Sequence, residues 1–244
     1  MDDSSLRAIV SQARAYCSSH SDPAVITKYS KYFKEGYDAF GVPDTDLRAL
    51  KDLVAAKPHF ERGDIFSLAD LLVCEPKYEM TSLVILLMRD LRGTLTLGEF
   101  RRAAQWLDHI RNWAHCDVLC GEVYGPCIRD GVVSRAEIED WARAEWKWRR
   151  RALPVTLITS VAARKELAPL LTSVRPLMHD GQKCVQQGMG WFLREVWKAD
   201  HVLAEGFLSE FKDTSPRVIF QYATEKMTPE GKERFRAAKK VPRS

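Results

Sequence analysis

The sequence predicts an all-α protein, and three observations support that fold class. Apolar residues recur at intervals of three and four, as at Leu153, Leu157 and Val161, which is the spacing of one helix face. No segment alternates apolar and polar residues over six positions between turn residues, so β-strands are not predicted. Helix-start signals recur along the chain, such as Asp22-Pro23, where a capping side chain precedes a proline at the first helical position.

Further signals place the individual helices. Thr96 and Ser134 each begin a capping-box pattern with a glutamate three residues later, and Ser215-Pro216 repeats the cap-then-proline pattern. Gly41 is typical of a helix end before the next helix starts. Between these signals we predict helices near residues 5–19, 23–40, 45–57, 63–74, 77–92, 97–109, 112–130, 135–145, 148–163, 165–173, 180–198, 200–211 and 215–227.

The spacing of the helix starts predicts how these helices are organised. Starts near residues 23, 63, 97, 135, 165 and 200 recur every 30–40 residues or so, the repeat length of helical hairpins such as HEAT or armadillo. We therefore predict an α-solenoid of about six HEAT-like hairpin repeats, with one helix of each pair lining a concave surface. A compact helical bundle is the alternative. No low-complexity linker divides the chain, so we predict a single domain over residues 1–228 and a basic C-terminal tail over residues 229–244.

The charge of the chain is mildly basic. It has 37 Lys and Arg residues against 33 Asp and Glu residues in 244, which gives a net charge of +4. This balance is compatible with an acidic partner but does not identify one. Two basic clusters are more informative: one covers residues 143–151, and the other lies towards the C-terminal end. A solvated helix face and a disordered tail would account for them equally well.

The cysteines and the apolar segments narrow the class of protein. Cys116, Cys120 and Cys127 lie close to His115, but Cys-x3-Cys on a helix lacks the turn geometry and the second ligand pair of a structural zinc site. We predict no metal and interpret the six cysteines as reduced, mostly buried thiols. No N-terminal segment resembles a signal peptide, and the longest apolar run, around Leu83–Met88, is too short to span a bilayer. We expect a soluble, cytoplasmic protein with no membrane partner.

Two tryptophans and an aspartate are the strongest candidates for a functional site. Trp113 and Asp117 are one helical turn apart and project from the same helix face, and Trp191 lies in another predicted helix. Indole faces beside a carboxylate suit a flat cation and developing positive charge. Core packing of Trp113 and a surface or capping role for Asp117 are the alternative. Gly188 and Gly190 lie inside the helix of Trp191, which indicates close approach of another helix or of a ligand.

These residues belong to sequence blocks through which the chain resembles the AlkD family of alkylpurine DNA glycosylases, which are built from HEAT-like repeats. The blocks run in order from about residue 28 to residue 227 and are Lys31-Tyr32-Phe33-Lys34 with Phe40-Gly41-Val42, Glu75-Pro76-Lys77-Tyr78-Glu79-Met80, Asn112-Trp113-Ala114-His115-Cys116-Asp117, Trp148-Arg149-Arg150-Arg151-Ala152, Gly190-Trp191-Phe192-Leu193-Arg194-Glu195 and Ser215-Pro216-Arg217. The block that contains Trp191 is the most specific. Shortly before it, where the family commonly carries a basic residue, this chain has Gln186-Gln187-Gly188.

The resemblance implies a function and a set of site residues. It implies a monofunctional glycosylase that hydrolyses the N-glycosidic bond of cationic alkylated purines, 7-methylguanine and 3-methyladenine, in double-stranded DNA and leaves an abasic site. It also implies a solvent-open site in which the lesion stays largely in the duplex, and a monomer without a small-molecule cofactor. The implied catalytic residues are Asp117, Trp113 and Trp191. The implied DNA-binding residues are Arg151, Tyr32, Arg150 and Lys147.

Physical chemistry agrees with this interpretation. A purine alkylated at N3 or N7 is cationic and leaves readily, so the main task is to stabilise the oxocarbenium-like sugar and to orient water, which a carboxylate such as Asp117 can do. Packing is the alternative for Tyr32, and an exposed basic run is the alternative for Arg151. Arg194 and Glu195 are expected to pair with neighbours. A dyad of His115 with Asp117 is not expected, because the two side chains point in different directions on a helix.

Two other functions remain open at this point. One is a non-catalytic HEAT-like repeat protein that binds distorted or branched DNA. Asp117 argues against it, because a pure DNA binder gains little from a carboxylate near phosphates. The other is a protein–protein scaffold, which would explain the repeats but neither the two tryptophans with Asp117 nor the arginine cluster.

Overall fold

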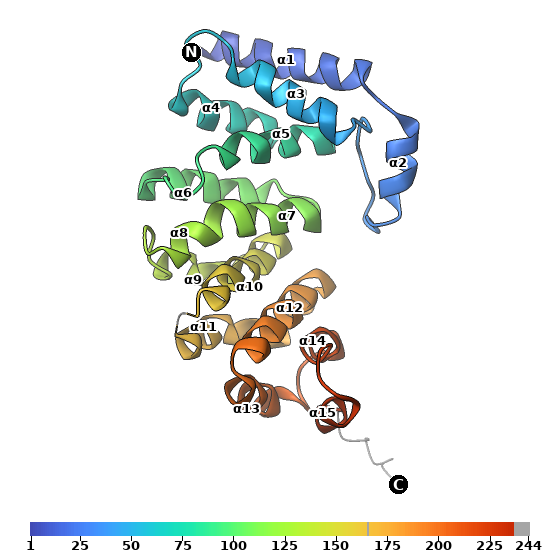
Figure 1. Cartoon of the computed structure of the whole chain (residues 1–244), viewed down its shortest axis with the longest axis vertical. Coiled ribbons are helices and arrows are strands. Elements are labelled where there is room, and N and C mark those ends of the chain that lie inside the picture. The colour runs from blue at the N-terminus through green and yellow to red at the C-terminus, as the bar shows by residue number, and fades with distance from the viewer. Residues whose placement is uncertain (165, 237–244) are drawn as a thin grey trace. The chain divides into compact units, whose positions relative to one another are not determined.

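The computed structural model describes residues 1–164 and 166–236, and all regular elements in these two ranges are helices (Figure 1). This result confirms the all-α fold class. The chain divides into two compact units, Met1–Val123 and Tyr124–Ser244. Within each unit the helices stack on one another in chain order, as in an α-solenoid. The concave DNA-binding surface and the single domain over residues 1–228 stay predictions.

The first unit is built around one buried helix. Its helices are α1 (Asp3–Ser19), α2 (Pro23–Ser30), α3 (Asp44–Ala55), α4 (Arg62–Leu72), α5 (Tyr78–Arg89), α6 (Leu97–Gln105), the 3-10 turn Trp106–Asp108 and α7 (Trp113–Leu119). Helix α5 packs against α3, α4 and α7, and it buries nearly its whole surface, including Met80, Leu83 and Leu87. Helix α2 is the opposite case, because none of its residues is buried.

The second unit has α12 at its centre. The π-helical turn Cys120–Tyr124, which begins in the first unit, is followed by α8 (Gly125–Arg129). The remaining elements are α9 (Ala136–Glu139), the 3-10 turn Asp140–Arg143, α10 (Lys147–Ala162), α11 (Leu167–Val174), the 3-10 turn Arg175–His179, α12 (Lys183–Ala199), α13 (His201–Phe211), α14 (Arg217–Ala223) and α15 (Pro229–Arg234). Helix α12 packs against α10, α13 and α14, and its residues Val185, Phe192 and Val196 are buried.

The predicted helix over residues 23–40 is wrong in its second half. Helix α2 ends at Ser30, and residues 31–43 form turns and irregular backbone. Gly36 and Gly41 have φ angles of 106° and 84°, outside the helical region. The backbone N–H groups of Phe40, Gly41 and Val42 donate to the carboxylate of Glu79 on α5, an acceptor that is remote in the sequence. Tertiary contact therefore overrides the local helix signal.

Two of the predicted helix caps, at Asp22 and Thr96, are confirmed. Asp22 accepts from the N–H of Ala24, and Thr96 forms a complete capping box with Glu99. At the second predicted box, α9 has Arg135 and not Ser134 as its N-cap, and the hydroxyl of Ser134 accepts from the N–H of Ala136. The cap predicted at residue 215 is also wrong, since α14 follows Pro216 without a side-chain cap.

The C-terminal region contains a helix where a tail was predicted. Pro229 begins α15, and Thr228 caps it by accepting from the N–H of Gly231. The rest of the predicted tail, residues 237–244, lies outside the described residues. None of the helices in the described ranges is both long enough and apolar enough to cross a membrane.

The two glycines inside α12 mark close approaches by other helices. A Cβ atom at Gly190 would lie 2.5 Å from the Cβ of Tyr222 and 2.6 Å from the carbonyl oxygen of Ile219, both in α14. A Cβ atom at Gly188 would lie 3.2 Å from the Cγ of Arg151 in α10. The prediction that another helix approaches these glycines is confirmed.

We predict that Gly190→Ala lowers the free energy of unfolding by about 1–3 kcal/mol, because the added methyl group must push α14 away from α12. Gly206→Ala is the matched control: this glycine also lies inside a helix, α13, and a Cβ there meets nothing within 4 Å. The control should raise stability by up to about 1 kcal/mol through helix propensity. Urea unfolding measures both, and equal shifts would contradict the close approach.

Candidate functional site

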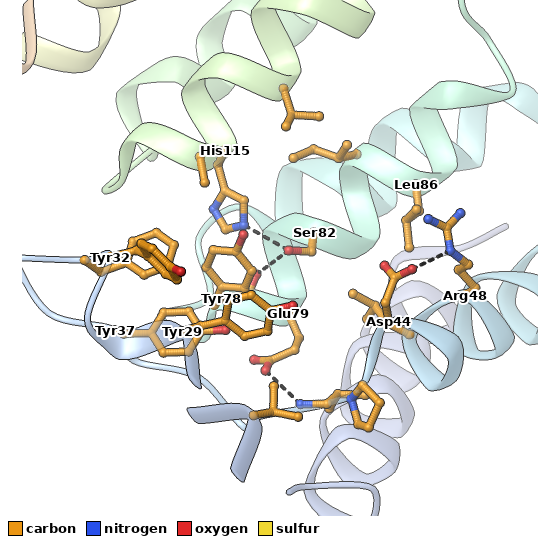
Figure 2. A pocket seen from close by; sticks show the side chains of 18 of the residues that line it. Tyr29, Tyr32, Tyr37, Asp44, Arg48, Tyr78, Glu79, Ser82, Leu86 and His115 are labelled. Carbon is orange, nitrogen blue, oxygen red and sulfur yellow. Dashed lines mark hydrogen bonds and ion pairs between the residues drawn. The ribbon is translucent and has the colours of Figure 1, made fainter. Parts of the chain in front are cut away.

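The first unit contains a cavity of about 840 Å³ that lies between α2, α3, α5 and α7 (Figure 2). Its lining is rich in aromatic side chains, which are Tyr29, Tyr32, Phe33, Tyr37, Tyr78 and Trp113. In Figure 2 the tyrosines gather on one side of the cavity, and the ion pair between Asp44 and Arg48 lies on the other. Two of the predicted site residues, Tyr32 and Trp113, therefore line the same cavity and form part of its aromatic wall.

Trp113 lies at the surface of this cavity and not in the core. Its side chain is 42% exposed, and its indole N–H donates to the carbonyl oxygen of Tyr32 at 3.2 Å. The ring of Phe33 stacks on the indole with 5.8 Å between centroids and 19° between planes. One indole face is thus supported while much of the ring is open, which removes core packing as the explanation for Trp113. Tyr32 is 55% exposed and is no packing residue either.

Asp117 lies one turn after Trp113 in the same helix. Both residues are within α7, so the shared helix face predicted from their spacing is confirmed. Asp117 is half-buried. The π-helical turn begins three residues later at Cys120, and π-turns occur frequently at functional sites. This short helix therefore carries a carboxylate and an accessible indole on one face.

His115 is a buried structural residue. Its ring stacks on Tyr78 with 4.1 Å between centroids, and its Nε2 lies 2.9 Å from the hydroxyl of Ser82 (Figure 2). The hydroxyl of Ser82 donates to the carbonyl of Tyr78, so it accepts from the Nε2–H of His115. The Nδ1 atom of His115 accepts from the side-chain amide of Asn112 at 2.9 Å. Burial lowers the pKa of His115 to about 3, so the ring is neutral. Both ring nitrogens are engaged, as expected if His115 forms no dyad with Asp117.

The predicted site residues of the second unit lie on two neighbouring helices. Trp191 is half-buried on α12, and its distance from Trp113 and Asp117 stays a prediction. Lys147 begins α10 and is half-buried, with its ammonium group 5.3 Å from the ring centroid of Trp148. Helices α10 and α12 pack together. Trp191 and Lys147 therefore belong to one packed part of this unit.

The arginines of the basic run contact groups inside the second unit. Arg151 is buried and donates to the carbonyl of Cys184, so it is not part of an exposed basic run. Arg150 pairs with Asp180 at 2.6 Å and donates to the carbonyl oxygens of Ala144 and Glu145. A phosphate contact by either arginine stays a prediction. On α12, Gln187 donates to the hydroxyl of Tyr222 at 2.8 Å.

Several other expectations can be checked in the described residues. Arg194 pairs with Glu195 at 3.2 Å and with Glu225, as expected for a helix-surface residue. Within the described ranges, no three His, Cys, Asp or Glu side chains gather as a metal site would need. Four of the cysteines are buried, which are Cys17, Cys116, Cys120 and Cys127. Cys184 is intermediate and Cys74 is exposed.

Three tyrosines of the cavity wall, Tyr29, Tyr37 and Tyr78, are not among the site residues predicted from the sequence. Tyr37 stacks on Phe33 at 4.7 Å and leans against Tyr78 at 5.1 Å, and burial raises the pKa of both phenols. The density of aromatic residues over positions 29–40 is the signal that indicates Tyr29 and Tyr37. That signal was obscured because the segment was predicted to be helical.

Comparisons with known proteins match the chain to one family. The model of a family described as "DNA alkylation repair enzyme" matches residues 14–227. A solved structure described as "Predicted DNA alkylation repair enzyme from Enterococcus faecalis" has a TM-score of 0.73 and 16% sequence identity, and the match covers 86% of this chain and 98% of that chain. At this identity the likeness supports the fold. No curated protein matches.

We predict a pH dependence of stability from His115. The unfolded chain takes up a proton at this histidine near its ordinary pKa of 6.5, while the folded protein does so only near 3. Between these values the unfolded state binds more protons, so the free energy of unfolding falls as the pH falls, by up to about 1.4 kcal/mol per pH unit. His115→Gln should flatten this dependence between about pH 7 and about pH 5 in urea unfolding. Equal slopes for variant and parent would contradict the buried, neutral histidine.

Proposed function

Because the chain belongs to the family of DNA alkylation repair enzymes, we propose that it is a DNA glycosylase for cationic alkylated purines. Its substrates would be 7-methylguanine and 3-methyladenine in double-stranded DNA, and its product an abasic site. The observation that carries the proposal is the arrangement of α7, which presents the open indole of Trp113 and the carboxylate of Asp117 on one face.

The proposed chemistry follows from the charge of the lesion. A purine alkylated at N3 or N7 carries a positive charge, and it leaves without much help from a general acid. Positive charge then develops on the sugar, where a carboxylate stabilises it and orients the attacking water. We assign this role to Asp117. In this mechanism the bond between the sugar carbon and the base nitrogen breaks, and its electron pair leaves with the base, which becomes a neutral purine. A water molecule then bonds to the sugar carbon, supplies the hydroxyl group of the abasic site and releases its other proton to solvent.

The tryptophans would serve the same cation. An indole face attracts a cationic ring or sugar by about 0.5–2 kcal/mol. Trp113 meets the requirement for such a contact, since Phe33 supports one face of the indole and the side chain is partly open. Trp191 is proposed as the second such group. The neutral state of His115 supports the proposal, because a cationic imidazole beside the cavity would repel the lesion.

Duplex binding would rest on the phosphate backbone. We propose that Tyr32, Lys147, Arg150 and Arg151 contact the DNA, with the arginines exchanging an intramolecular partner for a phosphate. In the first unit, the exposed lysines Lys28, Lys31 and Lys34 add positive charge near Tyr32. Such contacts give affinity that is independent of sequence and falls with salt. We further propose that the protein acts as a cytoplasmic monomer without metal or small-molecule cofactor.

The decisive variant is Asp117→Asn, which keeps the shape of the side chain and removes its charge. The rate of 7-methylguanine release under single-turnover conditions should fall by roughly tenfold to a thousandfold, equivalent to about 1.4–4 kcal/mol on the barrier. Fold and DNA affinity should survive, and binding could tighten, because the carboxylate repels phosphates.

The matched control is Asp52→Asn, which removes an exposed carboxylate from α3. This variant should release base at the parental rate. If folded Asp117→Asn also matched the parent, Asp117 would not be the catalytic carboxylate. If the parent itself released no base, the non-catalytic DNA-binding function would replace the glycosylase.

A further inference from the structure

We infer that Glu79 is the positioning residue for Trp113: its carboxylate fixes the segment 31–43, and this segment holds the indole in place. The significance of this role for catalysis rests on the proposed function, in which Trp113 meets the lesion. The link between Glu79 and the orientation of Trp113 can be measured without any reaction.

The environment of Glu79 is that of an anchored anion. It is the second residue of α5 and is 2% exposed. Its carboxylate accepts the backbone N–H groups of Phe40 at 2.9 Å, Gly41 at 2.7 Å and Val42 at 3.2 Å. Hydrogen bonds to an ionised acceptor are stronger than those between neutral groups, and buried N–H groups without an acceptor are costly. Glu79 therefore fixes three consecutive peptide groups of a segment that has no helix or strand.

The same end of the segment is fitted tightly to α2. The carbonyl of Gly41 accepts from the N–H of Asp22 at 3.0 Å. A Cβ atom at Gly41 would lie 2.6 Å from the carbonyl oxygen of Asp22 and 2.7 Å from the side chain of Ile26. With its φ of 84°, this position requires glycine. Nearby, the N–H of Tyr78 donates to the carbonyl of Asp38 at 2.8 Å. The backbone near residue 41 therefore has little freedom once Glu79 is in place.

The other end of the segment holds Trp113. The carbonyl oxygen of Tyr32 accepts the indole N–H, and the ring of Phe33 stacks on the indole. Phe33 in turn stacks on Tyr37 with 4.7 Å between centroids and 13° between planes. The ring of Tyr37 contacts the ring of Tyr78, the residue that precedes Glu79, with 5.1 Å between centroids. A continuous aromatic contact therefore runs from α5 through the segment to the indole.

The physical consequence of losing the anchor is specific. An amide at position 79 has one acceptor oxygen, and its NH₂ group faces backbone donors. The N–H groups of residues 40–42 would lose acceptors, the segment would shift, and the indole would lose both its hydrogen bond and its stacking partner. A misplacement of about 1 Å in a group that meets the substrate can cost on the order of a hundredfold in rate. Substrate binding, which rests mainly on phosphate contacts, would change little.

The test uses the full chain and the variant Glu79→Gln. The indole N–H resonance of Trp113 is assigned in a ¹H–¹⁵N spectrum by its loss in Trp113→Phe. In Glu79→Gln this resonance should move or broaden, and saturating single-turnover release of 7-methylguanine should slow by about tenfold to a hundredfold with little change in DNA affinity. Phe33→Leu, which leaves the carboxylate bonds intact, should move the same resonance.

Glu99→Gln is the matched control. Glu99 also accepts a backbone N–H, that of Thr96 at 2.7 Å, and pairs with Arg62, but it lies on α6 and does not line the cavity. This variant should lose stability without moving the Trp113 resonance or the rate. If Glu79→Gln does not fold, the Trp113 resonance and the rate are measured in Glu79→Asp instead. Aspartate keeps the charge, but its side chain is too short to accept from all three N–H groups.

Two outcomes would overturn the inference. A folded Glu79 variant with the parental Trp113 resonance and rate would show that the carboxylate does not position the indole. An equal shift in Glu99→Gln would show that the resonance reports only on general stability. If the parent protein releases no base, the proposed function fails, while the resonance still tests the link from Glu79 to Trp113.

Discussion

The buried carboxylate of Glu79 is the contact on which the local structure of the candidate site depends. Three backbone N–H groups of the segment 31–43 donate to it, and this segment has no regular hydrogen-bond ladder of its own. Buried peptide groups must find acceptors. Glu79 supplies them from α5, the most buried helix of the first unit. The segment that Glu79 holds carries Tyr32, Phe33 and Tyr37 of the aromatic cavity, and Tyr32 and Phe33 contact Trp113.

Two carboxylates of the first unit differ in burial, and the difference is consistent with the roles that we propose for them. Glu79 is almost inaccessible, and its oxygens are occupied by backbone donors, so it serves the fold. Asp117 is half-buried on α7, next to an indole that is 42% exposed. A negative charge that is to act on a substrate must be held near the surface of a supported site, and a negative charge that anchors a backbone must be covered.

The second unit shows how helix packing constrains the residues around Trp191. Gly190 allows the backbone of α14 to approach α12, and Gly188 makes room for the side chain of Arg151. Arg151 and Arg150 then meet carbonyl and carboxylate oxygens of their own unit. An arginine that already has such partners is held in a defined place, and transfer to a phosphate exchanges one set of hydrogen bonds for another. This arrangement distinguishes the run at residues 147–151 from a freely solvated basic face.

Patterns along the chain are enough to predict the fold class, most of the helices and the shared face of Trp113 and Asp117. These features depend on contacts within a few residues, namely helical spacing, caps such as Asp22 and Thr96, and the turn length of a helix. Four features become visible only when the helices are packed together. Residues 31–43 are not helical, Tyr37 and Tyr78 form a cavity wall, Arg151 is buried, and the close approach of α14 requires Gly190. Each of these features depends on a residue from another helix, such as Glu79, which accepts from the backbone N–H of Gly41. A sequence pattern covers only a few neighbouring residues, so it cannot predict a contact with a residue that is far away in the chain.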